Sequence, residues 1–194
     1  MPILWLILIV LAIAAVGYVF GRTRALQSAG GNSRNLHSLP SFYGANVALK
    51  TIVPAIGLLI IWLLVQPFYV NSQVSGMIPE SAVQEGSSLS LVMAEVRRTA
   101  SGLENAVAAG AITEDMARNA RADITDVTAR LKEAGQVVTS DITQPVLRAA
   151  QSYRIMNASG YTVMTAVVIL VALLGAAFSW FQTHSEYRAR NVVE

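Results

Sequence analysis

Side chains able to carry out chemistry are scarce in this chain of 194 residues. It has no cysteine, which excludes disulfide bonds, thiol catalysis and cysteine-based metal sites. Its two histidines, His37 and His184, are too far apart in the sequence to indicate a metal centre. Glu114 and Asp115 are adjacent, so on a helix their carboxylates point in different directions and do not converge on a substrate. We therefore expect no catalytic residue, no metal site and no cofactor, and we predict that the chain is not an enzyme.

Motifs that bind nucleotides or activate nucleophiles are also missing. The sequence has no glycine-rich loop followed by Lys-Ser/Thr, no HExxH and no GxSxG. Arg22, Arg24, Arg34 and His37 could bind an anion or a lipid headgroup, but basic residues next to an apolar segment more simply set its membrane topology. No residue can be assigned to substrate binding from these patterns.

The elements that must position these few groups are three long apolar runs. The chain is 54% hydrophobic and 13% charged, whereas a soluble domain is about 25% charged. The runs cover residues 3–20, 47–70 and 161–181, and each is long enough to cross a bilayer as a helix. The first run has no basic region before it, so we expect an anchor rather than a cleaved signal peptide. The predicted fold is an all-α integral membrane protein with three transmembrane helices.

The predicted spans carry little polarity. No ionisable residue lies in the dense apolar part of any span, so the three helices do not resemble a complete translocation pathway. Lys50 is expected to extend toward the headgroups, and Pro54 is expected in the first turn of its helix, with a kink as the alternative. Three pairs of small residues four apart would allow helices to approach closely: Gly17 with Gly21, Ala172 with Ala176, and Gly175 with Ser179.

The distribution of charge predicts the orientation. Residues 21–50 include four basic residues and no acid, whereas residues 71–160 include eight basic and ten acidic residues. The positive-inside rule then places the first loop and the C-terminus in the cytoplasm, with the N-terminus and the middle segment outside. The predicted divisions are the first transmembrane helix (1–21), a basic cytoplasmic loop (22–47), the second helix (48–70), an exported segment (71–159), the third helix (160–182) and a cytoplasmic tail (183–194).

The exported segment has the periodicity of a helical hairpin. Apolar or small residues recur at spacings of three and four from Leu89 to Ala106, which indicates a helix packed against another helix. Gly110 breaks this pattern and Thr113 is a candidate N-cap for the second helix. The first stripe is Leu89, Val92, Val96, Thr99, Leu103 and Ala106; the second, on one helix that Gly135 would end, is Met116, Ala120, Ile124, Val127 and Leu131.

The hairpin needs support from other helices. Its small aliphatic seams make a thin core, so it is expected to lean on the membrane part, a second copy or another chain. A third helix is predicted to start near Pro145 and to continue into the third span. The charged residues of the hairpin could form a recognition patch, but a solvated face with weak pairs four residues apart explains them more simply.

Short motifs around the second span resemble one transporter family. They are the arginines followed by Ala25-Leu26, the Gly30-Gly31 turn, the LHSLP run at 36–40, Tyr43-Gly44, and the YRARN run at 187–191. With the order of span, basic loop, span, exported helices and span, they resemble the N-terminal extension of PstC-type permease subunits of phosphate ABC importers. The resemblance covers essentially the whole chain.

The resemblance implies import of inorganic phosphate across the bacterial inner membrane, with ATPase subunits, a second permease subunit and a periplasmic phosphate-binding protein as partners. The permease core of that family would begin after the position of Glu194, so we expect a fragment of a longer polypeptide, with a stand-alone accessory protein as the alternative. No phosphate-binding residue is carried over, and the implied role is an accessory scaffold. The rival interpretation is a membrane-anchored sensor or assembly protein with a periplasmic helical bundle.

Overall fold

The secondary structure of the chain is helical throughout its described part. The computed structural model describes residues 3–79, 88–119, 124–133 and 142–184, together with Tyr187 and Ala189, and all regular elements in these ranges are helices. This confirms the predicted all-α class. The elements are α1 (Ile3–Ser28), the short 3₁₀ helix η1 (Ser33–Asn35), α2 (Pro40–Ser75), α3 (Leu89–Ala108), α4 (Glu114–Arg118), α5 (Ile124–Glu133) and α6 (Gln144–Gln182).

The chain forms two compact units. Unit 1 comprises Met1–Leu63 and Tyr161–Glu194, and unit 2 comprises Leu64–Gly160. Helices α2 and α6 therefore contribute residues to both units. Helices α1, α2 and α6 are long and apolar enough to cross a membrane, which confirms the three predicted spans by length and composition.

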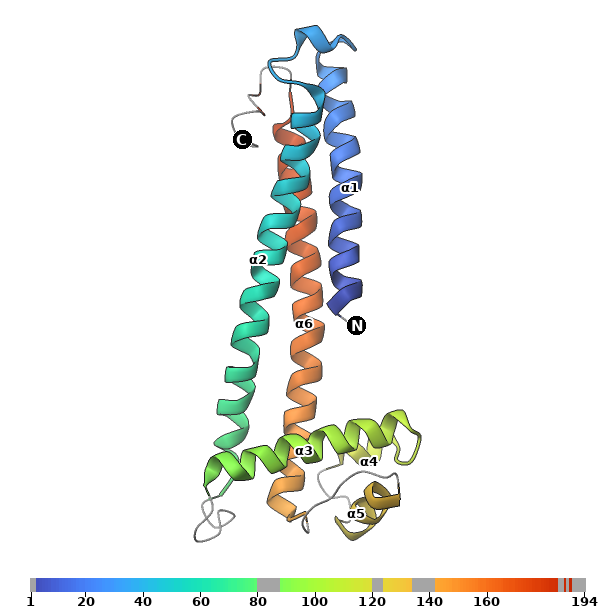
Figure 1. The fold of residues 1–194 in the computed structure, drawn as a ribbon, viewed down its shortest axis with the longest axis vertical. Helices are drawn as coiled ribbons and strands as arrows, with labels where there is room; N and C mark the ends of the chain where they lie inside the picture. Colours follow the sequence, from blue (N-terminus) through green and yellow to red (C-terminus); the bar gives the residue numbers. More distant parts are fainter. Residues whose placement is uncertain are drawn as a thin grey trace. The chain divides into compact units, whose positions relative to one another are not determined.

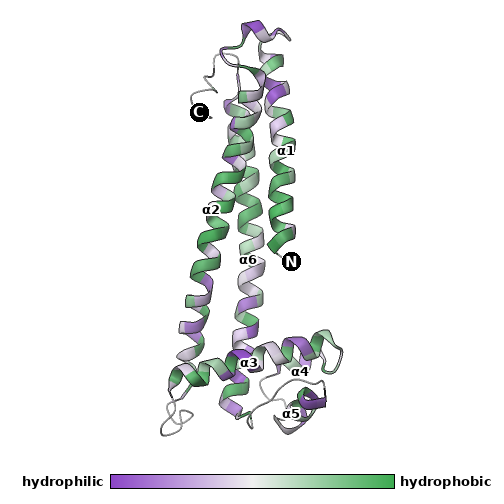
Figure 2. Ribbon diagram, in the orientation of Figure 1, coloured by the Kyte–Doolittle hydropathy of each residue, from purple (hydrophilic) through white to green (hydrophobic). Residues whose placement is uncertain are grey.

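Unit 1 is a three-helix bundle with an apolar interior and an apolar exterior. Within it, α1 runs beside α2 and α6 (Figure 1), and hydrophobic residues dominate all three helices (Figure 2). Leu6, Leu59 and Met164, one from each helix, lie in its buried core. Trp5 and Ile61 are by contrast well exposed. A surface of this kind is expected to face lipid or other apolar helices rather than water.

Glycines bring the helices of unit 1 close together. A Cβ atom at Gly21 would lie 2.6 Å from Cγ2 of Val47, and one at Gly17 would lie 3.0 Å from Cγ1 of the same residue. At Gly44 it would lie 2.7 Å from the carbonyl oxygen of Tyr18. At Gly175 it would collide with the carbonyl oxygen of Lys50. The close packing predicted for Gly17, Gly21 and Gly175 is confirmed.

The prediction that Pro54 lies in a first turn is wrong. Helix α2 begins at Pro40, so Pro54 lies well inside it. Because proline has no N–H, the carbonyl of Lys50 loses its usual partner four residues later. Gly175 of α6 packs directly onto that carbonyl. An interior proline is tolerated here because a neighbouring helix covers the freed carbonyl.

In unit 2 the predicted seam of α3 is confirmed in all but its first residue. Val92, Val96, Thr99, Leu103 and Ala106 are buried, whereas Leu89, the first residue of the helix, is 45% exposed. The break and the cap that follow are confirmed as well. Gly110 has a φ of 74°, which favours glycine. The side chain of Thr113 accepts a hydrogen bond from the Met116 N–H at 3.2 Å.

The second helix of the hairpin is not continuous as predicted. Helix α4 ends at Arg118, and Asn119 adopts an extended conformation before α5 begins at Ile124. The carbonyl of Asn119 accepts a hydrogen bond from Nε2 of Gln151 on α6 at 2.9 Å, which takes the place of a helical partner. Val127 and Leu131 of the predicted stripe are buried; Ala120 and Gly135 lie outside the described residues.

The hairpin packs against the C-terminal end of α2 and the N-terminal end of α6. Its core includes Val70 and Val74 from α2, and Leu147 and Ala150 from α6. Of the three supports that the sequence left open, the structure thus uses residues continuous with the membrane helices. Helix α6 runs without interruption from Gln144 to Gln182, which confirms the predicted helix from Pro145 into the third span.

Candidate functional site

Polar side chains of unit 1 gather near the C-terminal ends of α1 and α6 and the N-terminal part of α2. We call this cluster the polar junction. Its contacts join α1, α2 and the last turn of α6 to the segment after it, and they link residues that are more than a hundred positions apart in the sequence. The polar junction comprises Arg24, Asn46, Lys50, Ser179, Gln182, Thr183 and Tyr187.

Lys50 joins α2 to the end of α6 and to the residues that follow. Its Nζ donates to Oε1 of Gln182 at 2.7 Å and to the hydroxyl of Tyr187 at 3.2 Å. The ring of Tyr187 also lies 6.5 Å from the ring of Tyr43, which is fully buried. The ammonium group of Lys50 thus holds the chain after α6 against α2, and its extension toward the headgroups stays a prediction.

Asn46 supplies a buried polar contact between α2 and α6. Its Nδ2 donates to the hydroxyl of Ser179 at 2.8 Å, and both residues are fully buried. A hydrogen bond between membrane helices contributes roughly 0.6–2 kcal/mol, because the alternative is an unsatisfied group in an apolar medium. Asn46 and Ser179 therefore help to fix the register of α2 against α6 at this point. Apolar packing alone specifies helix register only weakly.

Arg24 ties α1 to the end of α6. Its Nε donates to the carbonyl of Thr183 at 3.2 Å, and its guanidinium lies 3.9 Å from the centroid of the Trp180 ring. A cation at the C-terminal end of a helix is favoured by the helix dipole, and its stacking on an indole adds a cation–π attraction. The guanidinium is thus held in a defined position.

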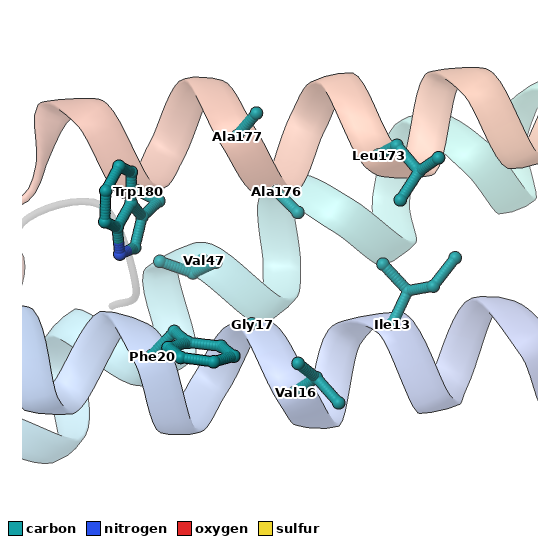
Figure 3. A pocket seen from close by; sticks show the side chains of 9 residues that line it. All are labelled: Ile13, Val16, Gly17, Phe20, Val47, Leu173, Ala176, Ala177 and Trp180. Carbon is teal, nitrogen blue, oxygen red and sulfur yellow. The ribbon is translucent and has the colours of Figure 1, made fainter.

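An apolar groove runs along unit 1 from this position. It has a volume of about 360 Å³ and lies between α1 and α6, with Val47 of α2 beneath it (Figure 3). Trp180, which stacks on Arg24, lines one end, and Ile13 lines the groove on α1 about two turns away from Phe20. The nine lining residues are Ile13, Val16, Gly17, Phe20, Val47, Leu173, Ala176, Ala177 and Trp180.

In unit 2 the ionic contacts centre on Glu114. Its Oε2 lies 2.6 Å from Nη2 of Arg154, and its Oε1 lies 2.7 Å from Nε of Arg118. Hydrogen bonds from Arg154 and then Arg118 hold the pKa of the Glu114 carboxyl below its usual value. The side chain of Arg154 is only 14% exposed. The pair connects the start of α4 to α6.

A family model described as a phosphate ATP-binding cassette transporter matches residues 7–177. The chain belongs to this family. The matched range includes most of each apolar helix and the helices of unit 2. This confirms the phosphate ABC transporter association that the sequence motifs suggested. Comparison of the chain with curated proteins and with solved structures gives no match.

In the described part of the chain, the four predicted anion-binding candidates are not brought together into one site. Arg22, Arg34 and His37 are exposed and, among the described residues, make no hydrogen bond or ion pair with Arg24. Of these four side chains, and within the ranges that the structure describes, only that of Arg24 contacts α6 and the residue after it. Of the predicted pairs four residues apart, Glu114–Arg118 and Asp126–Arg130 are present at 2.7 Å and 3.0 Å.

Sequence reasoning missed the contacts that join distant parts of the chain. Asn46 falls in a segment predicted as a loop, so nothing in the sequence indicated that it pairs with Ser179 on α6. Glu114 and Arg154 are 40 residues apart, and no local pattern links them. The one usable signal was composition. Asn46 and Lys50 lie next to a long apolar run, and if the helix extends over them, their buried polar groups require hydrogen-bond partners.

Proposed function

We propose that this chain is the N-terminal accessory region of a PstC-type permease subunit of an ATP-driven inorganic phosphate importer in the bacterial inner membrane. Its role is non-catalytic: it scaffolds the transmembrane complex. The partners are the second permease subunit, the ATPase subunits and the periplasmic phosphate-binding protein. Family membership and the sequence motifs around the second span support the assignment.

The observation that carries the scaffold role is that unit 1 is apolar on its outer face as well as in its interior. Its interior is apolar side chains in contact, with glycines that let the helices touch. Its outer face presents large apolar side chains such as Trp5, Leu174 and Phe178. A bundle of this kind offers surfaces for lipid and for further membrane helices, and its polar junction keeps those surfaces in a defined arrangement.

Deletion of residues 3–181 from the complete subunit tests this role. We expect phosphate uptake by cells to fall, together with the amount of ATPase subunit that co-purifies with the permease. Residues 1–194 supplied as a separate chain should restore part of both quantities, because scaffolding by packing does not require a covalent link. Unchanged uptake and unchanged co-purification after deletion would contradict the proposal.

The orientation with unit 2 outside is part of the same proposal, and the natural lack of cysteine allows a direct test. Ala109→Cys and Ser33→Cys place single thiols at exposed positions in unit 2 and in the basic loop. A membrane-impermeant maleimide added to spheroplasts should label the Ala109→Cys chain and should label the Ser33→Cys chain only after lysis. The opposite pattern would reverse the topology.

A further inference from the structure

The apolar groove of unit 1 has the character of a site for an amphiphile. The nine residues that line it are apolar or glycine, and they come from α1, α2 and α6 (Figure 3). Val16, Phe20 and Leu173 on its rim are about half exposed. The lining residues of α1 extend from Ile13 to Phe20, which is a length of about 10 Å along the helix. An alkyl chain matches this surface.

A defined cation lies at one end of the groove. Phe20 and Arg24 are four residues apart on α1 and therefore share a face of the helix. The guanidinium of Arg24 stacks on Trp180, which lines the groove, and uses its Nε for the Thr183 carbonyl. Among the described residues, its two Nη atoms have no hydrogen-bond partner and no acid pairs with them.

The surrounding charge favours an anion at this end. Residues 21–50 contain four basic residues and no acidic one. Lys50 gives two of its three N–H groups to Gln182 and Tyr187, whereas within the described part of the chain both Nη atoms of Arg24 are without a hydrogen-bond partner. A guanidinium binds phosphate oxygens through paired N–H groups, which is stronger and more directional than a point charge.

We propose that the groove binds one anionic phospholipid, with the phosphate on the Nη atoms of Arg24 and an acyl chain along the groove. Charge complementarity at the Arg24 end decides between this occupant and a further transmembrane helix. Close helix crossing requires small residues that are open to the partner. Of the small lining residues, Gly17 is already covered by Val47, since a Cβ there would lie 3.0 Å from Cγ1 of that residue, which leaves Ala176 and Ala177 on α6.

The test uses the complete subunit in nanodiscs, with phosphatidylglycerol and phosphatidylcholine in equal amounts, followed by native mass spectrometry after release into detergent. We expect one retained phosphatidylglycerol per chain and no matching retention of phosphatidylcholine. Arg24→Gln should weaken retention by about tenfold, which is the usual effect of losing a hydrogen bond to a charged group. Arg22→Gln is the matched control, because Arg22 is exposed and lies two residues away on the same helix.

Two further variants separate the headgroup from the acyl chain. Ala177→Phe fills the groove while leaving Arg24 in place, and it should also lose the lipid. Arg24→Lys keeps the charge but not the planar stack, and it should retain an intermediate amount. Circular dichroism and size-exclusion profiles establish that each variant is folded.

The proposal is overturned by any of four results: equal retention of the two lipids, equal loss with Arg22→Gln and Arg24→Gln, full retention in Arg24→Gln, or full retention in Ala177→Phe. A change in the number of associated chains in Ala177→Phe, with lipid retention intact, would identify a protein helix as the occupant instead.

Discussion

The two units of this chain are both helical, but they are held together in different ways. In unit 1 the helices touch through glycines, and the backbone of one helix packs against the next, as at Gly44 with Tyr18. In unit 2 the helices are separated by interlocking aliphatic side chains such as Val96, Leu103 and Leu131. Unit 1 exposes mainly apolar residues, whereas unit 2 exposes charged residues on α3, α4 and α5 together with apolar ones such as Phe68 on α2. This difference in packing is the one expected if unit 1 is surrounded by lipid and unit 2 by water.

Burial of apolar surface cannot discriminate between neighbours in a lipid environment, because lipid tails are as apolar as the side chains. Unit 1 accordingly relies on close backbone approach and on a few polar contacts at the polar junction. In water, burial of aliphatic side chains is itself the main stabilising term. Unit 2 can therefore use an ordinary core, with ion pairs adding orientation at its surface.

The largest effect is expected from removing a side chain from the core of unit 2. Leu103 is fully buried, and Leu103→Ala should cost about 2–5 kcal/mol through lost burial and the cavity that remains. Hydrogen exchange of the α3 amides in the full chain measures this loss. Leu91→Ala is the matched control on the same helix, because Leu91 is 63% exposed and should change exchange little. Equal effects would remove the distinction between the seam and the outer face.

The complementary change adds a methyl group to a helix contact of unit 1. At Gly175 a Cβ meets the carbonyl of Lys50, which cannot move aside as a side chain would. Gly175→Ala should destabilise the bundle by about 1–3 kcal/mol, measured by thermal unfolding in detergent. At Gly57 no atom lies within 4 Å of an added Cβ, and Gly57→Ala should stabilise the helix by about 0.5–1 kcal/mol. A loss of the same size at Gly57 would contradict the backbone-contact account.

The smallest effect concerns the ion pair that connects α4 to α6. Since Glu114 is 43% exposed, solvent screens the pair, and Glu114→Gln should cost about 1 kcal/mol or less at pH 7. The folded pKa of this carboxyl is depressed below the reference value of 4.5. The unfolded chain therefore takes up the proton first as the pH falls. The stabilisation is complete above that reference value and disappears as the pH drops through the folded pKa.

Thermal unfolding of the natural chain and of Glu114→Gln at two pH values measures this contribution. The difference in midpoint should be present at pH 7 and should shrink as the pH is lowered below the reference value of 4.5, because the natural carboxyl then takes up its proton as well. Asp115→Asn serves as the control, because Asp115 occupies the same first turn and makes no ion pair among the described residues. A midpoint difference that persists at the lower pH would mean that Glu114 acts through packing rather than charge.

Much of the fold could be predicted because it depends on neighbours in the sequence. The spans follow from apolar length, the seam of α3 from its three-and-four spacing, and the start of α4 from the Thr113 cap. The prediction of one helix through Asn119 was wrong because the deciding partner, Gln151, belongs to another helix. Pro54 was misplaced for a related reason, since α2 begins at Pro40, well before the dense apolar run.

The candidate sites were predictable only in their composition. Basic residues after the first span were recognised, but which of them is held by other helices was not. Arg24 is the one that Trp180 and Thr183 fix in place, and these partners lie at the other end of the chain. The groove beside it could not be predicted, because it arises from the spacing between α1 and α6 rather than from either helix alone.

By itself, the sequence determined that the chain is helical, that three segments suit a membrane, and that one helix stops just before Gly110. These properties depend on residues within a few turns of each other. The tertiary structure alone decided that Asn46 meets Ser179, 133 residues away, and that Glu114 meets Arg154. Such contacts form only after distant helices pack, and many pairings are compatible with the same local pattern.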